Sequence, residues 1–533
     1  MLLAGAAAAP LHAQAAPARP LDVLHYDLSL DLPTRGTDIE GRAVLTVART
    51  SPADTLRLDL IALRVDSVLV DGRPTAVARD SATIGVPLPP GAHDTLTVAV
   101  RYGGSPSDGF IIRTDAEGRW TGFGDNWPQR ARYWIPSVDE PWDKATVTWT
   151  VRAPSDRRIV GNGDLVEETP IAPGPDGVPR TLTRWSEAKP VPTYVIVIAA
   201  APLAYYSLGR SACGRSDFGG CVRQSVYVAP EVLSFLPGPF AHARDIVDFF
   251  ATLVAPFPYE HLAHVQSSTR FGGMENATEI FYADKPFRDR TMRDGVIAHE
   301  TAHQWFGDAV TPARFAELWL SEGFATYWAQ LWTQHARGDS AFRAGMEKLR
   351  DEIVAAPVCA ERPVRDTLQT DYLALLDANS YQKGAWVLHM LRSTLGDSVF
   401  FRGVRAYYLA HRNGNATTDD LRRALERASG TPLGWFFTQW VERPGWAELT
   451  THWRYDRAAR RVTLEIDQGT RFAPYRFPLV VEVDDARGRA RRVTVHVAAL
   501  PAQRVVLPLR LDDPPSRIVL DPDVELLATF AAR

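Results

Sequence analysis

Residues 293–310 read RDGVIAHETAHQWFGDAV and contain the pentapeptide HETAH at 299–303. In an α-helix, residues four apart lie on one face, so both imidazoles can reach a single metal ion and Glu300 lies beside that ion. Only about 0.02 such patterns are expected by chance from the His and Glu content of a chain of this length. The apolar residues on both sides predict a buried helix, where two unliganded histidines would be costly. The stretch therefore predicts a metal-binding helix.

A catalytic zinc ion takes three protein ligands and leaves a fourth position open. The best candidate for the third ligand is Glu322, nineteen residues after His303 in the apolar stretch LWLSEGFATYW. Metal ligation, or an ion pair with a buried arginine, would each remove the cost of burying this carboxylate. We expect His299, His303 and Glu322 to hold one Zn²⁺ per chain, with Glu300 as the general base. Glu317 is either an acceptor for a ligand imidazole N–H or a surface residue.

The composition is that of an ordinary multidomain globular protein. Its 533 residues suggest about three or four domains. Lys+Arg 59 against Asp+Glu 63 gives a net charge of −4, and 45% of the residues are hydrophobic. This balance excludes a disordered acidic protein and a basic nucleic-acid-binding coat, so no nucleic-acid partner is expected.

Hydropathy patterning divides the chain into three parts. Alternation of apolar and polar residues over 20–205 predicts an N-terminal antiparallel β domain, with a hairpin loop at 170–180. Apolar residues three and four apart predict a mostly helical domain over 206–445. Alternation returns over 446–533 and predicts a small C-terminal β module. The expected fold class is multidomain α+β.

The first residues and the cysteines bear on localisation. Residues 1–15, MLLAGAAAAPLHAQA, end in an Ala-x-Ala pattern typical of a signal peptide and predict a periplasmic or secreted protein, with a disordered leader as the alternative. No segment reaches the ~18 uninterrupted apolar residues of a membrane span. In an exported chain Cys213 and Cys221 would close a small disulfide loop and leave Cys359 free.

A family resemblance rests on several motifs together. GGMEN at 272–276, HETAHQWFGD and LWLSEGFA resemble the aminopeptidase N family of gluzincin zinc metallopeptidases, whose pattern is G-x-M-E-N followed by HExxH-x18-E. The segments at 137–146, 381–391 and 436–445 also have counterparts in that family. The resemblance implies a saddle-like N-terminal β domain, a thermolysin-like catalytic domain and a small β-sandwich. The large C-terminal helical domain of many relatives is absent from this sequence, which implies a more open cleft or one covered by a partner subunit.

The resemblance also assigns roles to further residues. Glu275 would bind the free α-amino group of a peptide, because a carboxylate pairs with an ammonium and orients it. Met274 and Gly273 would lie along the bound peptide, since glycine lets a backbone approach closely. Tyr381 would donate a hydrogen bond to the tetrahedral oxyanion.

Two positions depart from the family pattern. The family has a Gln fourteen residues before the residue that matches Asp139, and often a Glu or Gln twelve residues before it. This chain has Asp125 and Trp127 at those positions. Asp125 can still meet an ammonium, whereas Trp127 cannot replace a carboxylate. We therefore expect a reshaped amino-terminal subsite that includes Asp125.

The leading hypothesis is a zinc aminopeptidase that acts on peptides with a free N-terminus. One alternative is an endopeptidase that admits longer or blocked peptides through an open cleft. The other is a catalytically dead binding scaffold, which is disfavoured because the expected ligands, base and tyrosine are all present.

Overall fold

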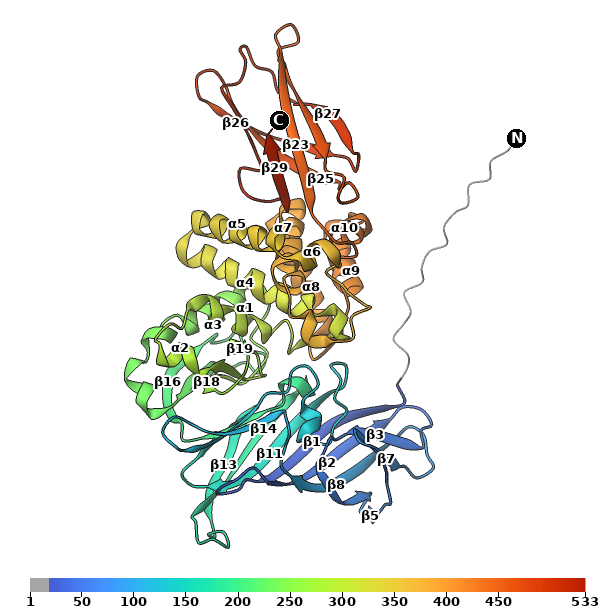
Figure 1. Cartoon of the computed structure of the whole chain (residues 1–533), viewed down its shortest axis with the longest axis vertical. Coiled ribbons are helices and arrows are strands. Elements are labelled where there is room, and N and C mark those ends of the chain that lie inside the picture. The colour runs from blue at the N-terminus through green and yellow to red at the C-terminus, as the bar shows by residue number, and fades with distance from the viewer. Residues whose placement is uncertain (1–18, 533) are drawn as a thin grey trace, which may run out of the picture.

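A computed structural model describes residues 19–532, so the leader predicted at residues 1–15 lies outside the described residues. The described chain forms three bodies stacked along the long axis of the molecule (Figure 1). A β domain lies at one end, a domain of helices with a five-stranded sheet and the two-stranded sheet of β21 (Val310–Pro312) and β22 (Gly414–Ala416) lies in the middle, and a β-sandwich lies at the other end. The predicted α+β fold class is confirmed.

The N-terminal domain is built on an eight-stranded sheet. Apolar side chains alternate with polar ones along its strands, and the apolar set is buried. All neighbours are antiparallel except β1 and β11, which run parallel. The predicted loop at 170–180 is the hairpin between β13 and β14. In spatial order the strands are β13 (Asp164–Ile171), β14 (Arg180–Pro192), β11 (Lys144–Pro154), β1 (Leu21–Asp31), β2 (Ile39–Arg49), β8 (Asp94–Gly104), β4 (Arg64–Val70) and β5 (Arg73–Pro74).

Two smaller sheets complete this domain. One of them faces the middle domain, where Phe123 packs edge-on against Phe281 at 6.0 Å between ring centroids. Its strands are β12 (Arg158–Gly161), β15 (Ile198–Ala201), β10 (Trp120–Gly124) and β9 (Phe110–Thr114), and those of the other sheet are β3 (Thr55–Asp59), β7 (Thr83–Pro87) and β6 (Ala78–Arg79).

The middle domain contains a five-stranded mixed sheet that the hydropathy pattern did not predict. Its edge strand is β19, which carries Gly273 and Met274 of the GGMEN motif. The motif therefore begins on the edge strand of the sheet, where a peptide could add as a further strand. In spatial order the strands are β16 (Ala204–Ser211), β17 (Val222–Val228), β18 (His261–Ser267), β20 (Glu279–Ala283) and β19 (Gly273–Met274).

The predicted helices of this domain are confirmed. The HETAH motif ends α3 (Asp294–His303), and Glu322 lies in the first turn of α4 (Trp319–Arg337). Tyr381 lies in a π-helical turn, Asn379–Lys383, that leads into α7 (Gly384–Leu395). No helix within residues 19–532 is both long and apolar enough to cross a bilayer. The remaining helices are α1 (Ala243–Leu253), α2 (Asp284–Arg288), α5 (Asp339–Ala355), α6 (Pro357–Glu361), α8 (Asp397–His411), α9 (Thr418–Ser429) and α10 (Gly434–Trp440).

The C-terminal domain consists of two facing sheets with an apolar interior. Every second residue of β24 and β25 is buried, as the alternation predicts. On the helical side, His389 of α7 donates from Nε2 to the Val524 carbonyl at 2.8 Å, which ties this domain to the middle one. The strands are β27 (Ala502–Val506), β24 (Arg461–Gln468), β23 (Ala447–Asp456) and β29 (Ala528–Ala532) in one sheet, and β26 (Ala490–Val497), β25 (Phe477–Asp484) and β28 (Arg517–Leu520) in the other.

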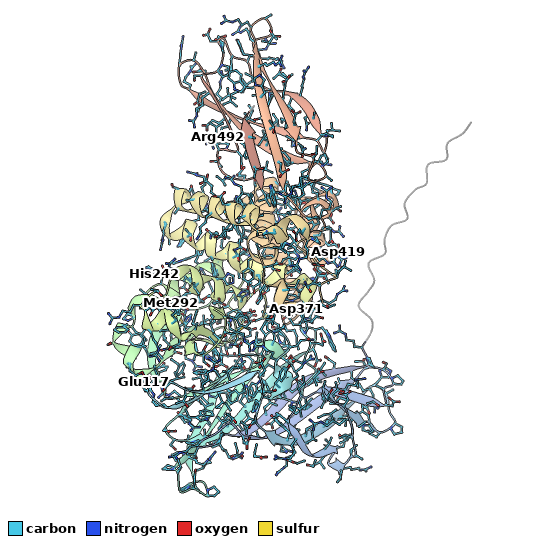
Figure 2. All side chains as sticks on the ribbon, viewed as in Figure 1. Glu117, His242, Met292, Asp371, Asp419 and Arg492 are labelled. Atoms are coloured by element: carbon cyan, nitrogen blue, oxygen red, sulfur yellow. A yellow bond between two sulfur atoms is a disulfide. The ribbon has the colours of Figure 1, made fainter. Side chains whose placement is uncertain are left out.

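The N-terminal domain fixes the turn that follows α3. The buried Lys144 ammonium donates to the carbonyls of Asp308 at 2.8 Å and Ala309 at 3.0 Å, and burial lowers its pKa to about 7. The Tyr194 hydroxyl donates to the Gly307 carbonyl at 3.0 Å. Glu117 of the N-terminal domain, labelled in Figure 2, lies beside α2 of the middle domain, at the edge of the contact between these two domains. The N-terminal and middle domains therefore contact each other at the turn that follows the HETAH helix.

Candidate active site

Helices α3 and α4 bring two imidazoles and one carboxylate to a common point. His299 Nε2 lies 3.1 Å from His303 Nε2 and 3.2 Å from Glu322 Oε2. His303 Nε2 lies 3.3 Å from the same carboxylate oxygen. Three donors bound tetrahedrally to zinc at about 2.0–2.1 Å would lie about 3.3 Å apart. The three donors thus have the chemistry and the spacing of a zinc site with one open position.

The cavity around these donors is rich in carboxylates. Its volume is about 300 Å³, and the described residues that line it include Glu275, Glu300 and Glu322 but no Lys or Arg. Burial raises the pKa of Glu275 and of Glu300 because desolvation disfavours the charged form. Buried carboxylates are tolerated when a cation neutralises them. A divalent metal ion and a substrate ammonium would supply the charge that the lining residues lack.

Ser321 and the Phe306 carbonyl orient the second histidine. His303 Nδ1 lies 2.9 Å from Ser321 Oγ and 3.1 Å from the Phe306 oxygen. Because both neighbours can accept a hydrogen bond, Nδ1 carries the proton and Nε2 keeps a lone pair for a metal ion. Gly307 permits this arrangement: its φ is +135°, and a Cβ there would lie 2.6 Å from Ser321 Oγ. Sequence reasoning missed Ser321, although it directly precedes the expected ligand Glu322.

Both interpretations of Glu317 are wrong. This carboxylate contacts no ligand imidazole, and it is only 1% exposed. It accepts hydrogen bonds from the backbone N–H and the hydroxyl of Thr418, and it lies 2.9 Å from Arg365 Nε. Glu317 therefore ties the segment before α4 to the start of α9.

Glu300 lies on α3 between the two histidines and faces the edge strand β19. A Cβ on Gly273 would lie 2.1 Å from Glu300 Oε1 and 2.3 Å from its Cδ. Only glycine at position 273 leaves room for the carboxylate. The family resemblance implied that Gly273 lies along the bound peptide. The structure shows in addition that Gly273 lies against the carboxylate of Glu300, the expected general base.

Glu275 reaches the same region from the loop after β19. One ligand atom from each of Glu275, Glu300 and His303 lies within 4.8 Å of the other two. The buried amide of Gln304 holds this loop, because its Nε2 donates to the Glu275 carbonyl at 3.1 Å and its Oε1 accepts from Thr278 N–H at 2.9 Å. Gln304 was not singled out in the sequence, where its one signal is its place directly after HETAH.

Tyr381 lies beside the ligand set. Its hydroxyl donates to Glu322 Oε1 at 2.8 Å, and its ring stacks on His299 with 5.8 Å between centroids. Met274, the neighbour of Gly273 on β19, also lines the cavity. The structure therefore brings eight of the nine predicted site residues to one cavity: His299, His303, Glu322, Glu300, Tyr381, Glu275, Gly273 and Met274.

Asp125 is the predicted residue that the cavity does not include. Its Oδ1 lies 2.8 Å from Arg130 Nη2, and its Oδ2 lies 3.5 Å from Arg270 Nε. The carboxylate is 1% exposed and is neutralised by these two guanidinium groups. Trp127 lines the cavity in its place. A contact between Asp125 and a substrate ammonium is therefore not supported by the geometry.

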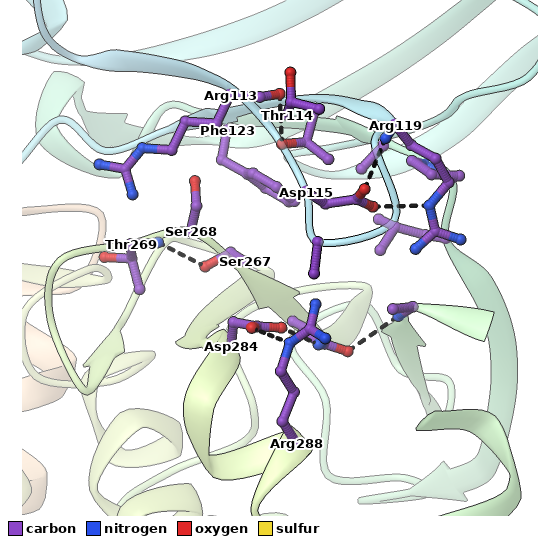
Figure 3. A pocket seen from close by; sticks show the side chains of 17 residues that line it. Arg113, Thr114, Asp115, Arg119, Phe123, Ser267, Ser268, Thr269, Asp284 and Arg288 are labelled. Carbon is purple, nitrogen blue, oxygen red and sulfur yellow. Dashed lines mark hydrogen bonds and ion pairs between the residues drawn. The ribbon is translucent and has the colours of Figure 1, made fainter. Parts of the chain in front are cut away.

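A larger cavity lies elsewhere, between the β9–β10 hairpin and α2 (Figure 3). Its volume is about 430 Å³, and it contains none of the predicted site residues. Arg119 pairs with Asp115 at 2.7 Å on one side, and Arg288 pairs with Asp284 on the other. The acids of this cavity are thus already matched by arginines, in contrast to the carboxylates around His303.

A HETAH helix beside a second helix with a glutamate, placed between a short mixed sheet and a helical lobe, defines the thermolysin-like class of zinc metallopeptidase folds. The family profile of the Peptidase M1 N-terminal domain matches residues 23–195, and that of the Peptidase family M1 domain matches residues 241–440. The chain belongs to this family, which is the aminopeptidase N family.

Several curated proteins are similar to this chain. Aminopeptidase N of Streptomyces lividans is 29% identical over 461 residues, which are 80% of this chain and 50% of the relative. Probable aminopeptidase 1 of Saccharolobus solfataricus is 26% identical over 492 residues, which are 87% of this chain and 58% of the relative. The chain thus spans between half and three fifths of the length of these curated relatives.

Solved structures show the same architecture. The M1 zinc metallopeptidase from Deinococcus radiodurans is 27% identical, with a TM-score of 0.69 over 80% of this chain and 94% of its own. A mutant of that protein has been solved with a Tyr-Ser-Ala substrate and is 25% identical, with a TM-score of 0.70 over 80% of this chain and 95% of its own. Legionella pneumophila aminopeptidase A, at 18% identity, shares the fold over 97% of this chain and 60% of its own, with a TM-score of 0.83.

Proposed function

We propose that this protein is a zinc aminopeptidase that releases N-terminal residues from peptides. The observation that carries the proposal is the distance of at most 4.8 Å between the ligand atoms of Glu275, Glu300 and His303. Within one amino-acid residue the amine nitrogen and the carbonyl carbon are only about 2.5 Å apart. An ammonium paired with Glu275 therefore presents the first peptide carbonyl, and no later one, to Glu300 and the metal ligands.

Each residue then has a defined task. When bound by His299, His303 and Glu322, zinc lowers the pKa of water and polarises a carbonyl. Glu300 accepts the proton of the attacking water and returns it to the leaving amine. Tyr381 donates its hydroxyl proton in a hydrogen bond to the oxygen on which negative charge develops.

The first test combines metal analysis with hydrolysis of aminoacyl anilides. We expect about one zinc ion per chain in the wild-type protein, loss of zinc in Glu322→Ala, and retained zinc with lost turnover in Glu300→Gln. Removing a general base lowers kcat by about 10²- to 10⁴-fold. Unchanged turnover in Glu300→Gln would exclude the mechanism.

The second test separates an aminopeptidase from an endopeptidase. One peptide is supplied with a free N-terminus and with an acetylated one. Because Glu275 pairs with an ammonium, only the free peptide should be cleaved, and it should lose its first residue. Equal cleavage of both peptides would favour the endopeptidase.

We also propose that the chain is exported. The leader at residues 1–15 is one reason, and the disulfide between Cys213 and Cys221 is another, because disulfides persist in oxidising compartments. Cys359 is buried and free. Expression of the whole chain in a bacterial host, followed by fractionation and N-terminal sequencing, should find a periplasmic product that begins at Ala16. A cytoplasmic product that retains the leader would contradict this proposal.

A further inference from the structure

A second groove, which no step of the mechanism uses, lies between the N-terminal and middle domains. Its volume is about 640 Å³, and the described residues that line it include none of those that line the catalytic cavity. One side is β13, the edge strand of the eight-stranded sheet, and the other is β16, the edge strand of the five-stranded sheet (Figure 1). We call it the junction groove. Cavities of this size hold small organic ligands.

Aromatic side chains of both domains line the junction groove. Trp185 of β14 is buried, and its ring lies 5.9 Å from the ring of His261. Tyr227 of β17 packs edge-on against Tyr205 of β16 at 5.4 Å between centroids. Tyr205 and Leu165 of β13 are 51% and 46% exposed. Because exposed apolar side chains gathered around a hollow mark binding sites, the groove favours a ligand with an aromatic body.

One cation of the junction groove has no counter-ion. Arg158 of β12 is partly buried, and within residues 19–532 its guanidinium has no ion-pair partner. Its guanidinium carbon lies 6.0 Å from the centroid of the Tyr227 ring. Arg223, in contrast, is paired with Asp164. Two further lining residues of opposite charge are exposed to water, Glu168 and Arg210. The inner surface thus offers one uncompensated positive charge, which suits a monoanion.

His261, at the start of β18, supplies a second hydrogen-bonding group. The residue is 6% exposed, and neither ring nitrogen has a hydrogen-bond partner in the described part of the chain. Asp164 Oδ1 lies 3.8 Å from Nδ1, which is beyond hydrogen-bond reach. Burial lowers the pKa of His261 to about 3, so the imidazole is neutral at pH 7 and carries one N–H. A ligand oxygen would give this N–H the partner that buried polar groups normally have.

We propose that the junction groove binds a carboxylic acid with an aromatic body, which is either a small acid or the C-terminal residue of a peptide. The carboxylate pairs with Arg158, because a guanidinium and a carboxylate form strong charge-assisted hydrogen bonds. The ring packs among Trp185, Tyr205 and Tyr227. A doubly charged phosphate fits less well, since only one positive charge is uncompensated and Asp164 lines the same groove. This inference goes beyond the proposed function and does not depend on catalysis.

Calorimetric titration of the zinc-loaded wild-type protein gives the first test. The probes are phenylacetate and the blocked dipeptide N-acetyl-alanyl-phenylalanine, which has no free amine for Glu275. We expect saturable binding of at least one acid, and binding weaker by at least about tenfold for the matching amide, which lacks the charge. Tighter binding of the dipeptide would identify a peptide C-terminus as the ligand, and tighter binding of phenylacetate a small acid. No saturable binding of either acid, or equal binding of acids and amides, would overturn the inference.

Variants test the individual residues. Arg158→Gln should weaken binding of the acid by at least about tenfold, whereas Arg158→Lys keeps the charge and should retain part of the affinity. Tyr205→Ala, at an exposed position, should also weaken binding. Arg101→Gln, at an exposed arginine of β8 in the same domain, is the matched control and should bind as the wild type does. Folded Arg158→Gln protein with wild-type affinity would contradict the assignment.

The metal site is the competing place for a carboxylate, and Glu322→Ala, which should lose zinc, separates the two. In the junction groove the acid should still bind Glu322→Ala, and it should raise the melting temperature of the wild type and of Glu322→Ala but not that of Arg158→Gln. Binding lost in Glu322→Ala and retained in Arg158→Gln would place the acid at the metal and overturn the inference. Binding in the groove without hydrolysis of any anilide would contradict the proposed function alone.

Discussion

Gly323 of α4 and Gly384 of α7 touch backbone to backbone. A Cβ on Gly323 would lie 2.9 Å from both the Cα and the carbonyl carbon of Gly384. Gly323 directly follows Glu322, and Gly384 comes three residues after Tyr381. The close approach of the two helices therefore sets the 2.8 Å hydrogen bond from the Tyr381 hydroxyl to Glu322 Oε1.

Gly323→Ala should separate the two helices at this point. Overpacking of this kind costs about 1–3 kcal/mol of unfolding free energy, partly offset by the higher helix propensity of alanine. Complete loss of one oxyanion donor lowers kcat by about 10²-fold or more. Because Gly323→Ala would displace the hydroxyl of Tyr381 without removing it, we expect kcat to fall by at least about tenfold. Thermal melting and anilide kinetics measure both effects.

The control for this prediction is Gly434→Ala at the start of α10. An added Cβ there has no heavy atom within 4 Å. This variant should keep wild-type melting and kinetics. A Gly323→Ala protein with wild-type kcat would show that the helix contact does not position Tyr381.

Gly273→Ala should displace the carboxylate of Glu300. The new Cβ would lie 2.1 Å from Glu300 Oε1, so the side chain must move. We expect kcat to fall toward the loss seen on removal of a general base, about 10²- to 10⁴-fold, with the zinc content unchanged. Gly272→Ala is the matched comparison, because a Cβ there meets nothing within 4 Å, and its loss should be at least tenfold smaller. Equal losses in the two variants would show that Gly273 does not act through the position of Glu300.

The sequence predicted the two β domains because alternation was strong. In β2 every second residue from Ile39 to Arg49 is buried, which is the pattern of a sheet with one covered face. The five-stranded sheet of the middle domain was missed for the opposite reason. All seven residues of β18 (His261–Ser267) are buried, polar ones included, and β19 has only two residues. Neither strand offers a period to detect.

Site residues could be predicted from the sequence where they belong to one motif or follow a helical spacing. His299, His303 and Glu322 follow from spacing along α3 and α4. The supports of the site depend on contacts between distant segments, which no local pattern records. Asp125 was assigned to the substrate from its position fourteen residues before Asp139, and that position does not reveal the ion pairs of its carboxylate with Arg130 at 2.8 Å and with Arg270 at 3.5 Å.

Ser321→Ala should weaken zinc binding without removing a ligand. The variant loses the hydroxyl 2.9 Å from His303 Nδ1 but keeps the Phe306 carbonyl at 3.1 Å. Loss of an outer partner of a ligand histidine costs about 10- to 100-fold in metal affinity, and the remaining carbonyl places the effect near the lower end. Competition with a chelator measures it. Glu317→Gln should leave zinc affinity unchanged and lower the melting temperature instead, so a loss of zinc affinity there would contradict the structure.

Glu279 gives a prediction on the pH dependence of stability. Its carboxyl group is fully buried on β20, and neither oxygen has a hydrogen-bond partner among the described residues. Burial raises its pKa well above the ordinary value of 4.5. Between the unfolded and the folded pKa, the folded protein keeps a proton that the unfolded chain has released. Stability therefore falls as the pH rises through this window, by about 1.4 kcal/mol per pH unit for this single group.

Glu279→Gln removes this proton linkage and keeps the size of the side chain. Near pH 5, where the wild-type carboxyl is neutral in the folded protein, the variant and the wild type should melt at similar temperatures. At pH 8 the variant should melt higher, because the wild type then either holds a costly proton or buries a charge. The exposed Glu347 of α5 supplies the control, since Glu347→Gln should shift melting equally little at both pH values. If Glu279→Gln gained no stability between pH 5 and pH 8, the carboxyl would have to be paired in solution.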